Sequence, residues 1–164
     1  MPPTAILVMG VSGSGKTTLG RALAVRLGWA FADADDHHSV ASVEKMARGE
    51  ALNDADRAPW LAGLHGLLAR HLREGRPLVL ACSALKESYR RTLIGDLPGV
   101  RIVFAHGPRE LIEARMKARD HFMPPSLLAT QFAALEPPVG AIEVDVAQPV
   151  EAGVECVLTQ LDDL

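Results

Sequence analysis

The chain has 164 residues, of which 48% are hydrophobic and 23% are charged, and its formal net charge is -3. This length fits one ordinary folded domain, and the composition excludes a disordered chain because enough apolar surface exists for a core. With a slight net negative charge, the chain has no overall positive field of the kind that attracts a nucleic-acid phosphate backbone. We therefore expect no nucleic-acid partner.

The sequence also offers no segment for crossing a membrane. Its longest apolar run, around residues 6–9, is far shorter than the roughly 20 residues that a bilayer requires, and the first residues lack the basic region of a secretion signal. Cys82 and Cys156 are the two cysteines and form no CxxC pair, so we expect two buried thiols rather than a disulfide or a zinc site. These features predict a cytoplasmic protein without a membrane partner.

Strand and helix patterns alternate from residue 5 onward. Residues 5–9 form an all-apolar run, which is typical of a parallel strand buried on both faces and which we expect at the centre of a sheet. A glycine-rich loop and a helix with leucines at every fourth position follow, and Gly28 is expected to end that helix. Residues 29–32 predict a second, short strand and residues 40–47 a short helix.

A longer helix comes next, with an apolar stripe that begins at Trp60 and with Pro59 in its first turn, where proline is tolerated. The rest of the chain repeats the alternation. We expect, in order, a strand at 78–82, a helix around 85–93, a strand at 101–105, a helix at 110–118, a polar connection at 119–125, a strand at 141–145 and a helix at 150–161.

This alternation predicts an α/β fold, a five-stranded parallel sheet with helices on both faces, in a single domain over residues 1–164. In such sheets ligands bind beyond the carboxyl ends of the strands. Gly10, Asp33, Asp35 and Ser83 all follow or end predicted strands. Separate stretches of the sequence therefore predict one shared cleft.

The strongest motif reads GVSGSGKT at residues 10–17 and matches the phosphate-binding pattern GxxxxGK[ST], placed between a strand and a helix. Its glycines let backbone N–H groups surround phosphate oxygens, and the start of the next helix adds its positive end. We expect Lys16 to reach the β- and γ-phosphates and the Thr17 hydroxyl to ligate magnesium. The predicted nucleotide-binding residues of this loop are Gly10, Val11, Ser12, Gly13, Ser14, Gly15, Lys16, Thr17 and Thr18.

The motifs that the chain lacks narrow the class of nucleotide-binding protein. The sequence contains neither an NKxD guanine-reading motif nor an LSGGQ-like transporter signature, and it is short for a motor or helicase ATPase. A compact domain of this kind most often phosphorylates a small acceptor. A non-catalytic nucleotide-binding regulatory module is the alternative from a different class.

Further motifs resemble those of the gluconokinase family along nearly the whole chain. They are FADADDHH at 31–38, EKMARGEALNDADRAPWL at 44–61, CSALKESYR at 82–90, ARDHFMPPSLLATQF at 118–132 and LEPP at 135–138. The sequence departs from the family's usual pattern at Ser39, Ser42 and Asp120. Shikimate kinases share the phosphate loop, so the resemblance rests on the later motifs.

This resemblance implies a P-loop NTPase fold like that of the nucleoside monophosphate kinases, with a mobile lid at about residues 115–126. It also implies that the chain transfers phosphate from ATP, with Mg²⁺, to D-gluconate and forms 6-phospho-D-gluconate, and that it assembles as a homodimer. A kinase of another small hydroxy acid or polyol, such as shikimate, stays the alternative.

The resemblance further implies roles for the acidic cluster after the second strand. Asp35 would orient the acceptor hydroxyl and accept its proton, and Asp33 would hold magnesium through water molecules. A solvated acidic turn is the alternative. His38 matches a family position and is expected to hydrogen-bond with the acceptor rather than to bind metal with His37, because adjacent side chains diverge.

Cations are needed to hold an anionic acceptor, since a guanidinium matches a carboxylate with two hydrogen bonds. The candidates are Arg57, Lys86 and Arg90, with solvated surface charge as the alternative for each, and Ser83 could offer its hydroxyl to a sugar.

The lid region of the family supplies further candidates. Arg115 and Arg119 are expected to contact the nucleotide phosphates, with Arg119 also stabilising the phosphate in transfer. Ordinary helix-surface arginines are the alternative. His121 would either contact the acceptor or serve simple packing.

Overall fold

The computed structural model describes residues 4–118 and 127–162. Within them, five parallel strands form one sheet in the order β2-β3-β1-β4-β5. The strands are β1 Ala5–Met9, β2 Ala30–Asp33, β3 Leu78–Ala81, β4 Val100–His106 and β5 Ile142–Asp145. The predicted five-stranded parallel sheet is confirmed, with β1 at its centre. The second strand ends one residue later than expected, so that it includes Asp33.

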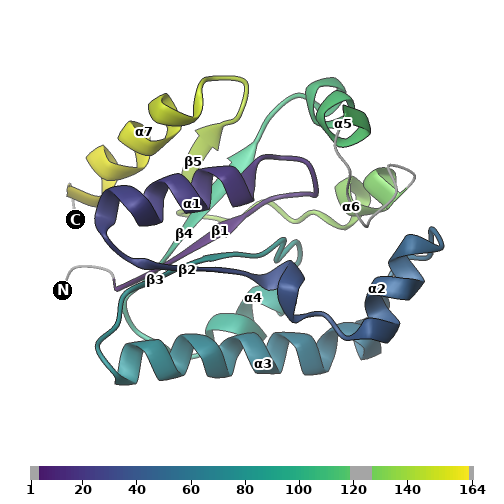
Figure 1. Ribbon diagram of the computed structural model, residues 1–164, viewed down its shortest axis with the longest axis horizontal. Coiled ribbons are helices and arrows are strands. Elements are labelled where there is room, and N and C mark those ends of the chain that lie inside the picture. The colour runs from purple at the N-terminus through teal and green to yellow at the C-terminus, as the bar shows by residue number, and fades with distance from the viewer. Residues whose placement is uncertain (1–3, 119–126, 163–164) are drawn as a thin grey trace.

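Helices cover both faces of the sheet (Figure 1). One face carries α1 Lys16–Leu27 and α7 Val150–Asp162, and the other carries α3 Asp54–Arg73 and α4 Glu87–Ile94. As predicted, Gly28 ends α1 in the left-handed conformation, with φ 70°. The fold class predicted from the sequence is therefore confirmed.

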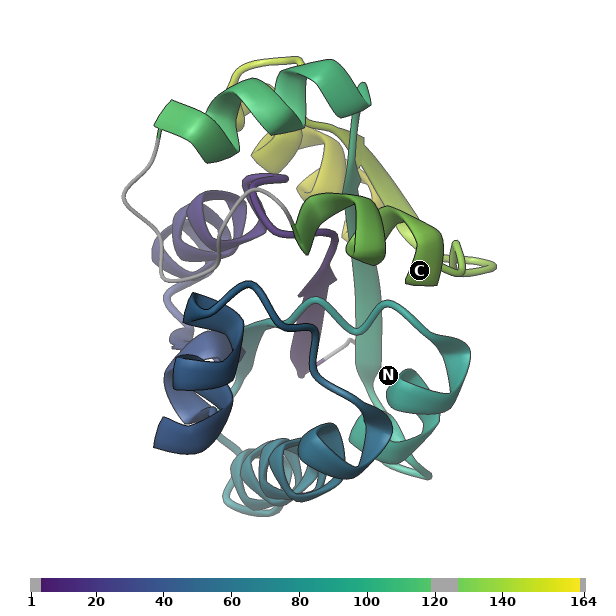
Figure 2. The same ribbon diagram turned by 90° about the vertical axis from the view of Figure 1, so that its right-hand side faces the viewer.

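The remaining helices gather at the carboxyl end of the sheet (Figures 1 and 2). They are the 3₁₀ helix η1 Ala34–His37, α2 Val40–Ala47, α5 Arg109–Ala118 and α6 Leu128–Ala134. The sequence did not predict η1 or α6. A single 3₁₀ turn is held by local polar contacts and needs no apolar period, and α6 has seven residues, too few for a clear stripe.

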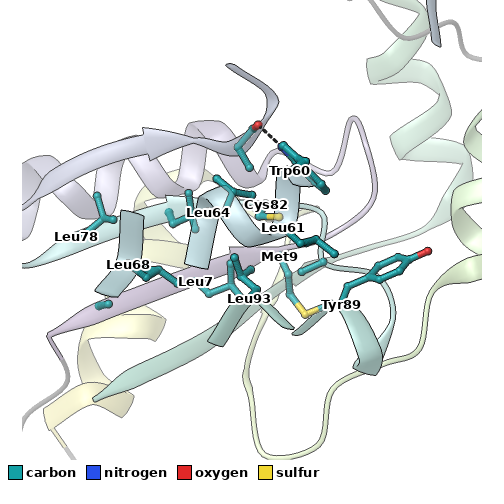
Figure 3. Packing of buried hydrophobic residues seen from close by; sticks show 14 of the residues in the cluster. Leu7, Met9, Trp60, Leu61, Leu64, Leu68, Leu78, Cys82, Tyr89 and Leu93 are labelled. Atoms are coloured by element: carbon teal, nitrogen blue, oxygen red, sulfur yellow. Dashed lines mark hydrogen bonds between the residues drawn. The ribbon is translucent and has the colours of Figure 1, made fainter. Parts of the chain in front are cut away.

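The apolar core lies in two layers because the side chains of β1 alternate between the faces of the sheet. Leu7 and Met9 belong to the same cluster as Leu64 and Leu68 of α3 on one face (Figure 3), whereas Ile6 joins residues of α1 and α7 on the other face. All five residues of β1 are fully buried. This double burial explains why the first strand is an unbroken apolar run.

The long helix α3 begins earlier than its apolar stripe suggests. The Asn53 side chain accepts the Asp56 N–H at 2.8 Å, while the Asp56 carboxylate accepts the Asn53 N–H at 2.9 Å. This reciprocal capping box starts the helix at Asp54. Pro59 is consequently the sixth helical residue and lies in the second turn, so its predicted place in the first turn was wrong.

The two cysteines differ in burial. Cys82 is fully buried at the end of β3, but Cys156 on α7 is half-buried, so only one of the two expected buried thiols is buried. Both are free thiols. In the part of the chain that the structure describes, no helix is long and apolar enough to cross a membrane.

Candidate active site

The phosphate loop leaves the centre of the sheet at β1 and leads into α1. A Cβ added to Gly10 would lie 2.5 Å from the Ala105 carbonyl oxygen, and one on Gly13 would lie 3.2 Å from Met116 Sδ. Gly15 has φ 89°. These positions require glycine, because side chains would clash with β4 and α5 or would strain the backbone. The Gly10 N–H also donates to the Ser83 carbonyl at 3.4 Å, which ties the loop to the residue after β3.

Two oxygens lie together at the start of α1. Thr17 Oγ1 donates to Asp33 Oδ2 at 2.9 Å, so the residue after Lys16 is joined to the end of β2. A hydroxyl and a carboxylate are the hard oxygen ligands that Mg²⁺ accepts, directly or through its waters. Among the described residues no group of three or more His, Cys, Asp and Glu side chains could hold a metal. The Thr17 hydroxyl and the Asp33 carboxylate are thus two neighbouring oxygens of a kind that suits Mg²⁺.

A cavity of about 460 Å³ opens beside the phosphate loop. Its walls include Gly13, Gly15 and Thr18, and another part of the lining comes from the end of β5, the connection after it and the start of α7. Arg115 of α5 lines it too and donates from Nη2 to the Val146 carbonyl at 2.8 Å. A nucleotide can thus place its phosphates on the loop and its base against the wall after β5. The sequence named no residue of that wall, because it carries no motif.

Asp35 lies close to the Thr17 hydroxyl and the Asp33 carboxylate because Asp33 also caps η1, the turn that contains Asp35. Asp33 Oδ1 accepts the Asp35 N–H at 3.0 Å and thereby caps η1. One carboxylate thus contacts Thr17 through one oxygen and Asp35 through the other. The structure brings together the predicted metal and base residues at the carboxyl ends of β1 and β2.

His38 packs next to the carboxylate of Asp35. Its ring stacks on Trp60 with centroids 4.1 Å apart, and Nε2 lies 3.9 Å from Asp35 Oδ1. Burial lowers the pKa of His38, although the neighbouring Asp35 charge opposes that shift, so the imidazole is neutral near neutral pH. Among the described residues its Nδ1 has no hydrogen-bond partner. Trp60 in turn donates to the Ala34 carbonyl at 2.8 Å (Figure 3).

Two of the predicted acceptor-binding cations gather around Tyr89. Arg57 donates from Nη1 to the Leu52 carbonyl at 2.6 Å and to Tyr89 Oη at 3.2 Å. Lys86 Nζ lies 5.5 Å from the centroid of the same ring. Tyr89 Oη donates to Asp54 Oδ1 at 2.7 Å, and burial followed by this bond raises the pKa of Tyr89. Tyr89 was not among the site residues predicted from the sequence, although it lies in the motif at residues 82–90.

Arg90 does not join that pair. It is only 3% exposed and donates to the Ala84 carbonyl at 2.7 Å and to the Glu136 carbonyl at 2.8 Å, with Glu87 as a further partner. Its guanidinium braces the segment after β3, where Ala84 has a positive φ of 44°. These internal bonds argue against Arg90 as a direct ligand of the acceptor, because they already engage the donors that would hold a carboxylate.

Two of the three residues at which the sequence departs from the family pattern, Ser39 and Ser42, contact each other. Ser39 Oγ accepts the Ser42 N–H at 3.1 Å and so caps α2. Arg119, Asp120 and His121 lie outside the described residues, and their roles stay predictions. Ser83 is half-buried beside the phosphate loop.

One residue from a distant segment contacts the phosphate loop. Gln131 of α6 accepts the Ser12 N–H through Oε1 at 2.7 Å. It lies within a motif of the family resemblance, but nothing in its local pattern indicated a contact across so many residues.

Comparison with known proteins places this site in a family. A model of the family described as "AAA domain" matches residues 6–138. The gluconokinase of Gluconobacter oxydans is 50% identical over 142 residues, which is 84% of this chain and 78% of that protein. The chain belongs to the gluconokinase family.

Solved structures agree with this assignment. A gluconokinase from Sinorhizobium meliloti is 44% identical with a TM-score of 0.87, and the match covers 98% of this chain and 93% of that one. A sugar kinase from a Janibacter species is 42% identical with a TM-score of 0.92, covering 98% and 95%. This member of the gluconokinase family is therefore an enzyme, a nucleotide-binding kinase that acts on a small molecule.

Proposed function

We propose that this kinase transfers the γ-phosphate of ATP, with Mg²⁺, to D-gluconate and forms 6-phospho-D-gluconate. The observation that carries the proposal is Asp33, whose two oxygens join Thr17 of the phosphate loop to the backbone of Asp35. This arrangement would hold a metal-ligating pair, Thr17 and Asp33, beside a candidate base, Asp35. The 50% identity to a gluconokinase supports gluconate as the acceptor.

On the nucleotide side, the chain supplies positive charge and fixed N–H groups. Lys16 is the first residue of α1 and is buried at the end of the phosphate loop, so its ammonium and the helix N-terminus would face the same phosphates. Thr17 and Asp33 would hold Mg²⁺, which neutralises charge on the β- and γ-phosphates. Arg115 would add a cation from α5, as its place in the cavity wall supports.

On the acceptor side, Asp35 would accept the proton of the attacking hydroxyl. Its backbone N–H is held by Asp33, which limits the movement of η1. His38 lies beside it as a neutral ring and would hydrogen-bond with the acceptor. In phosphoryl transfer the protein contributes mainly by positioning the nucleophile in line and by stabilising charge.

The acceptor's carboxylate would meet Arg57 and Lys86. Gluconate carries its carboxylate at the end opposite the reacting hydroxyl, so a cation is needed away from the phosphate loop. Arg57 and Lys86 lie on different elements yet both contact Tyr89, which supports one shared anion-binding region. Ser83 would contribute to the sugar hydroxyls from beside Gly10.

Several predictions of the family resemblance stay part of this proposal. Arg119 and His121 would complete the site from a mobile lid at about residues 115–126, of which residues 119–126 lie outside the described part. A homodimer and a cytoplasmic location also stay predictions. Sedimentation of the purified chain would test the assembly.

An ADP-release assay with Mg-ATP tests the acceptor. Gluconate, shikimate, other sugar acids and an uncharged polyol would each be offered to the wild type and to Lys16→Ala. We expect turnover with gluconate that Lys16→Ala abolishes while its circular dichroism spectrum stays native. Preference for shikimate would overturn the gluconate assignment. Nucleotide binding without turnover on any acceptor would favour a regulatory module instead.

A further inference from the structure

Gln131 is a polar residue that contacts the phosphate loop from outside its motif. Its Oε1 accepts the Ser12 N–H at 2.7 Å across 119 positions of sequence. Ser12 is only 4% exposed. A buried backbone N–H that loses its acceptor destabilises the fold, so this bond helps to fix the position of Ser12 in the phosphate loop.

The helix that carries Gln131 is pressed onto the same loop by apolar contacts. Leu128 is 1% exposed and belongs to a small buried cluster with Val11, Leu85 and Ile112. Val11 is itself a residue of the phosphate loop, and Ile112 comes from α5. The packing therefore fixes α6 against the loop independently of the hydrogen bond.

Glu136, which follows α6, is hydrogen-bonded to the residues on both sides of Lys86. The Glu136 N–H donates to the Leu85 carbonyl at 2.8 Å, and Glu136 Oε1 accepts the Glu87 N–H at 2.9 Å. Arg90 adds its bond to the Glu136 carbonyl. These bonds flank Lys86, one of the two proposed carboxylate-binding cations. Residues 127–136 thus join the phosphate loop to the segment that carries Lys86.

Gln131 also lines a cavity together with Arg57, the other proposed carboxylate-binding cation. A small cavity of about 40 Å³ is lined by Gln131 together with Arg57, Leu52 and Leu85. The same side chain therefore contacts the loop at Ser12 and lines a space shared with Arg57. Gln131 therefore adjoins both the phosphate loop and the cavity that Arg57 lines.

We propose that Gln131 is a positioning residue for phosphoryl transfer. It holds Ser12 of the phosphate loop in a fixed place relative to the proposed acceptor-binding residues Arg57 and Lys86. In-line transfer is sensitive to small displacements of the reacting groups. Loss of the bond would therefore lower kcat more than it weakens ATP binding, because Lys16 and the N-terminus of α1 remain in place. The inference rests on the proposed kinase reaction.

Three variants test this role. Gln131→Met keeps the length of the side chain and removes the acceptor, whereas Gln131→Glu keeps an oxygen acceptor of the same reach and adds a negative charge. Gln160→Met is the matched control, because Gln160 lies exposed on α7 and bonds only with Cys156 among the described residues. Each variant would be assayed for kcat, for KM with ATP and gluconate, and for its melting temperature.

We expect Gln131→Met to lower kcat by about 5- to 150-fold, the range for an unsatisfied buried donor, with KM for ATP changed by less than about threefold. Gln131→Glu should recover most of kcat and raise KM for ATP, because its charge repels the phosphates. Gln160→Met should match the wild type. The inference is overturned if Gln131→Met keeps wild-type kcat, if Gln131→Glu loses as much kcat as Gln131→Met, or if the loss of activity simply follows a fall in melting temperature.

The outcome does not depend on the acceptor being gluconate. The wild type is first assayed on the acceptor panel, and the variants are then compared on whichever acceptor it phosphorylates. Failure of the gluconate assignment would appear in the wild type, whereas failure of the Gln131 inference would appear only in the variants.

Discussion

Asp33 and Asp35 are separated by one residue, yet the structure gives them different partners. Asp33 contacts the Thr17 hydroxyl and the Asp35 backbone, so both of its oxygens are already engaged. Asp35 lies beside neutral His38 instead. Each carboxylate oxygen has a second lone pair, so Asp33 can still accept from a metal-bound water beside the Thr17 hydroxyl, whereas its neighbour Asp35 suits proton transfer.

The first prediction follows from this division. Asp35→Asn should lower kcat by about 10²- to 10⁴-fold, because a positioned general base contributes about that much, while the affinity for ATP stays nearly unchanged. Asp36→Asn is the matched control, since Asp36 is the exposed neighbour in η1. Steady-state kinetics with gluconate and nucleotide titration measure both effects. Wild-type turnover in Asp35→Asn would leave this carboxylate as part of a solvated acidic turn.

The second prediction concerns the cations around Tyr89. Arg57→Ala and Lys86→Ala should each raise KM for gluconate by about 10- to 150-fold, because a charge-assisted hydrogen bond contributes about 1.5 to 3 kcal/mol. KM for ATP should change little. Arg91→Ala is the control, since Arg91 is exposed on α4 and pairs only with Glu87 among the described residues.

An uncharged polyol of similar length separates charge from shape in the same variants. Its KM should respond less than that of gluconate, because it has no carboxylate to lose a partner. Unchanged KM for gluconate in both variants would remove Arg57 and Lys86 from the acceptor site.

At the scale of elements, the start of α3 is a junction between three helices. Asp56 belongs to the capping box and accepts a hydrogen bond from Lys45 of α2 at 2.8 Å, and these bonds lower the pKa of Asp56. Asp54 accepts from Tyr89 of α4. The first turn of α3 therefore holds together the segments that carry the proposed acceptor-binding residues.

The third prediction tests the cap itself. Asn53→Ala should lower the free energy of unfolding by about 1 kcal/mol and the melting temperature by about 2–4 °C, because the Asp56 N–H loses its acceptor. Asn53→Ser should retain most of the stability, since a serine hydroxyl can cap the same helix. Thermal and urea unfolding measure both variants. Equal losses in Ala and Ser would show that the capping bond does not stabilise α3.

At the scale of the whole molecule, the two thiols differ in how deeply the fold buries them. Cys82 is fully buried at the end of β3, and this burial raises the pKa of its thiol to about 12. Cys156 is half-buried on α7, where its Sγ faces the Glu143 carbonyl at 3.8 Å. A thiol reacts through its thiolate, so a buried thiol of raised pKa is inert until the fold opens.

The fourth prediction is that one thiol of the native chain reacts with an aromatic disulfide reagent and that the second reacts only on unfolding. Cys156→Ser should remove the fast reaction, and the remaining Cys82 should react with a denaturant dependence that follows global unfolding. Absorbance of the released thiolate measures both phases. Rapid reaction of Cys82 in native Cys156→Ser would contradict the packing of this region.

The sequence by itself determined the parts of the protein that depend on local pattern. The unbroken apolar run of β1 predicted a strand buried on both faces, and the glycines up to Lys16 predicted a phosphate loop at its end. The later motifs indicated the gluconokinase family. Hydrophobic period and motif spacing are properties of neighbouring residues, so they can be read without knowing what packs against them.

Only the tertiary structure decided which side chains meet. Arg90 was predicted from the sequence to help hold the acceptor's carboxylate, but the carbonyls of Ala84 and Glu136 engage it inside the fold. Gln131 contacts Ser12 across 119 positions, and no local pattern predicted that these two residues would meet. Burial and hydrogen-bond partners depend on packing between distant segments, and a residue type constrains them only weakly. The acceptor side of the site was therefore less predictable than its phosphate loop. The conformation of the phosphate loop follows from its own glycine-rich sequence, whereas the acceptor-binding side chains take their positions from helices that converge only in the folded chain.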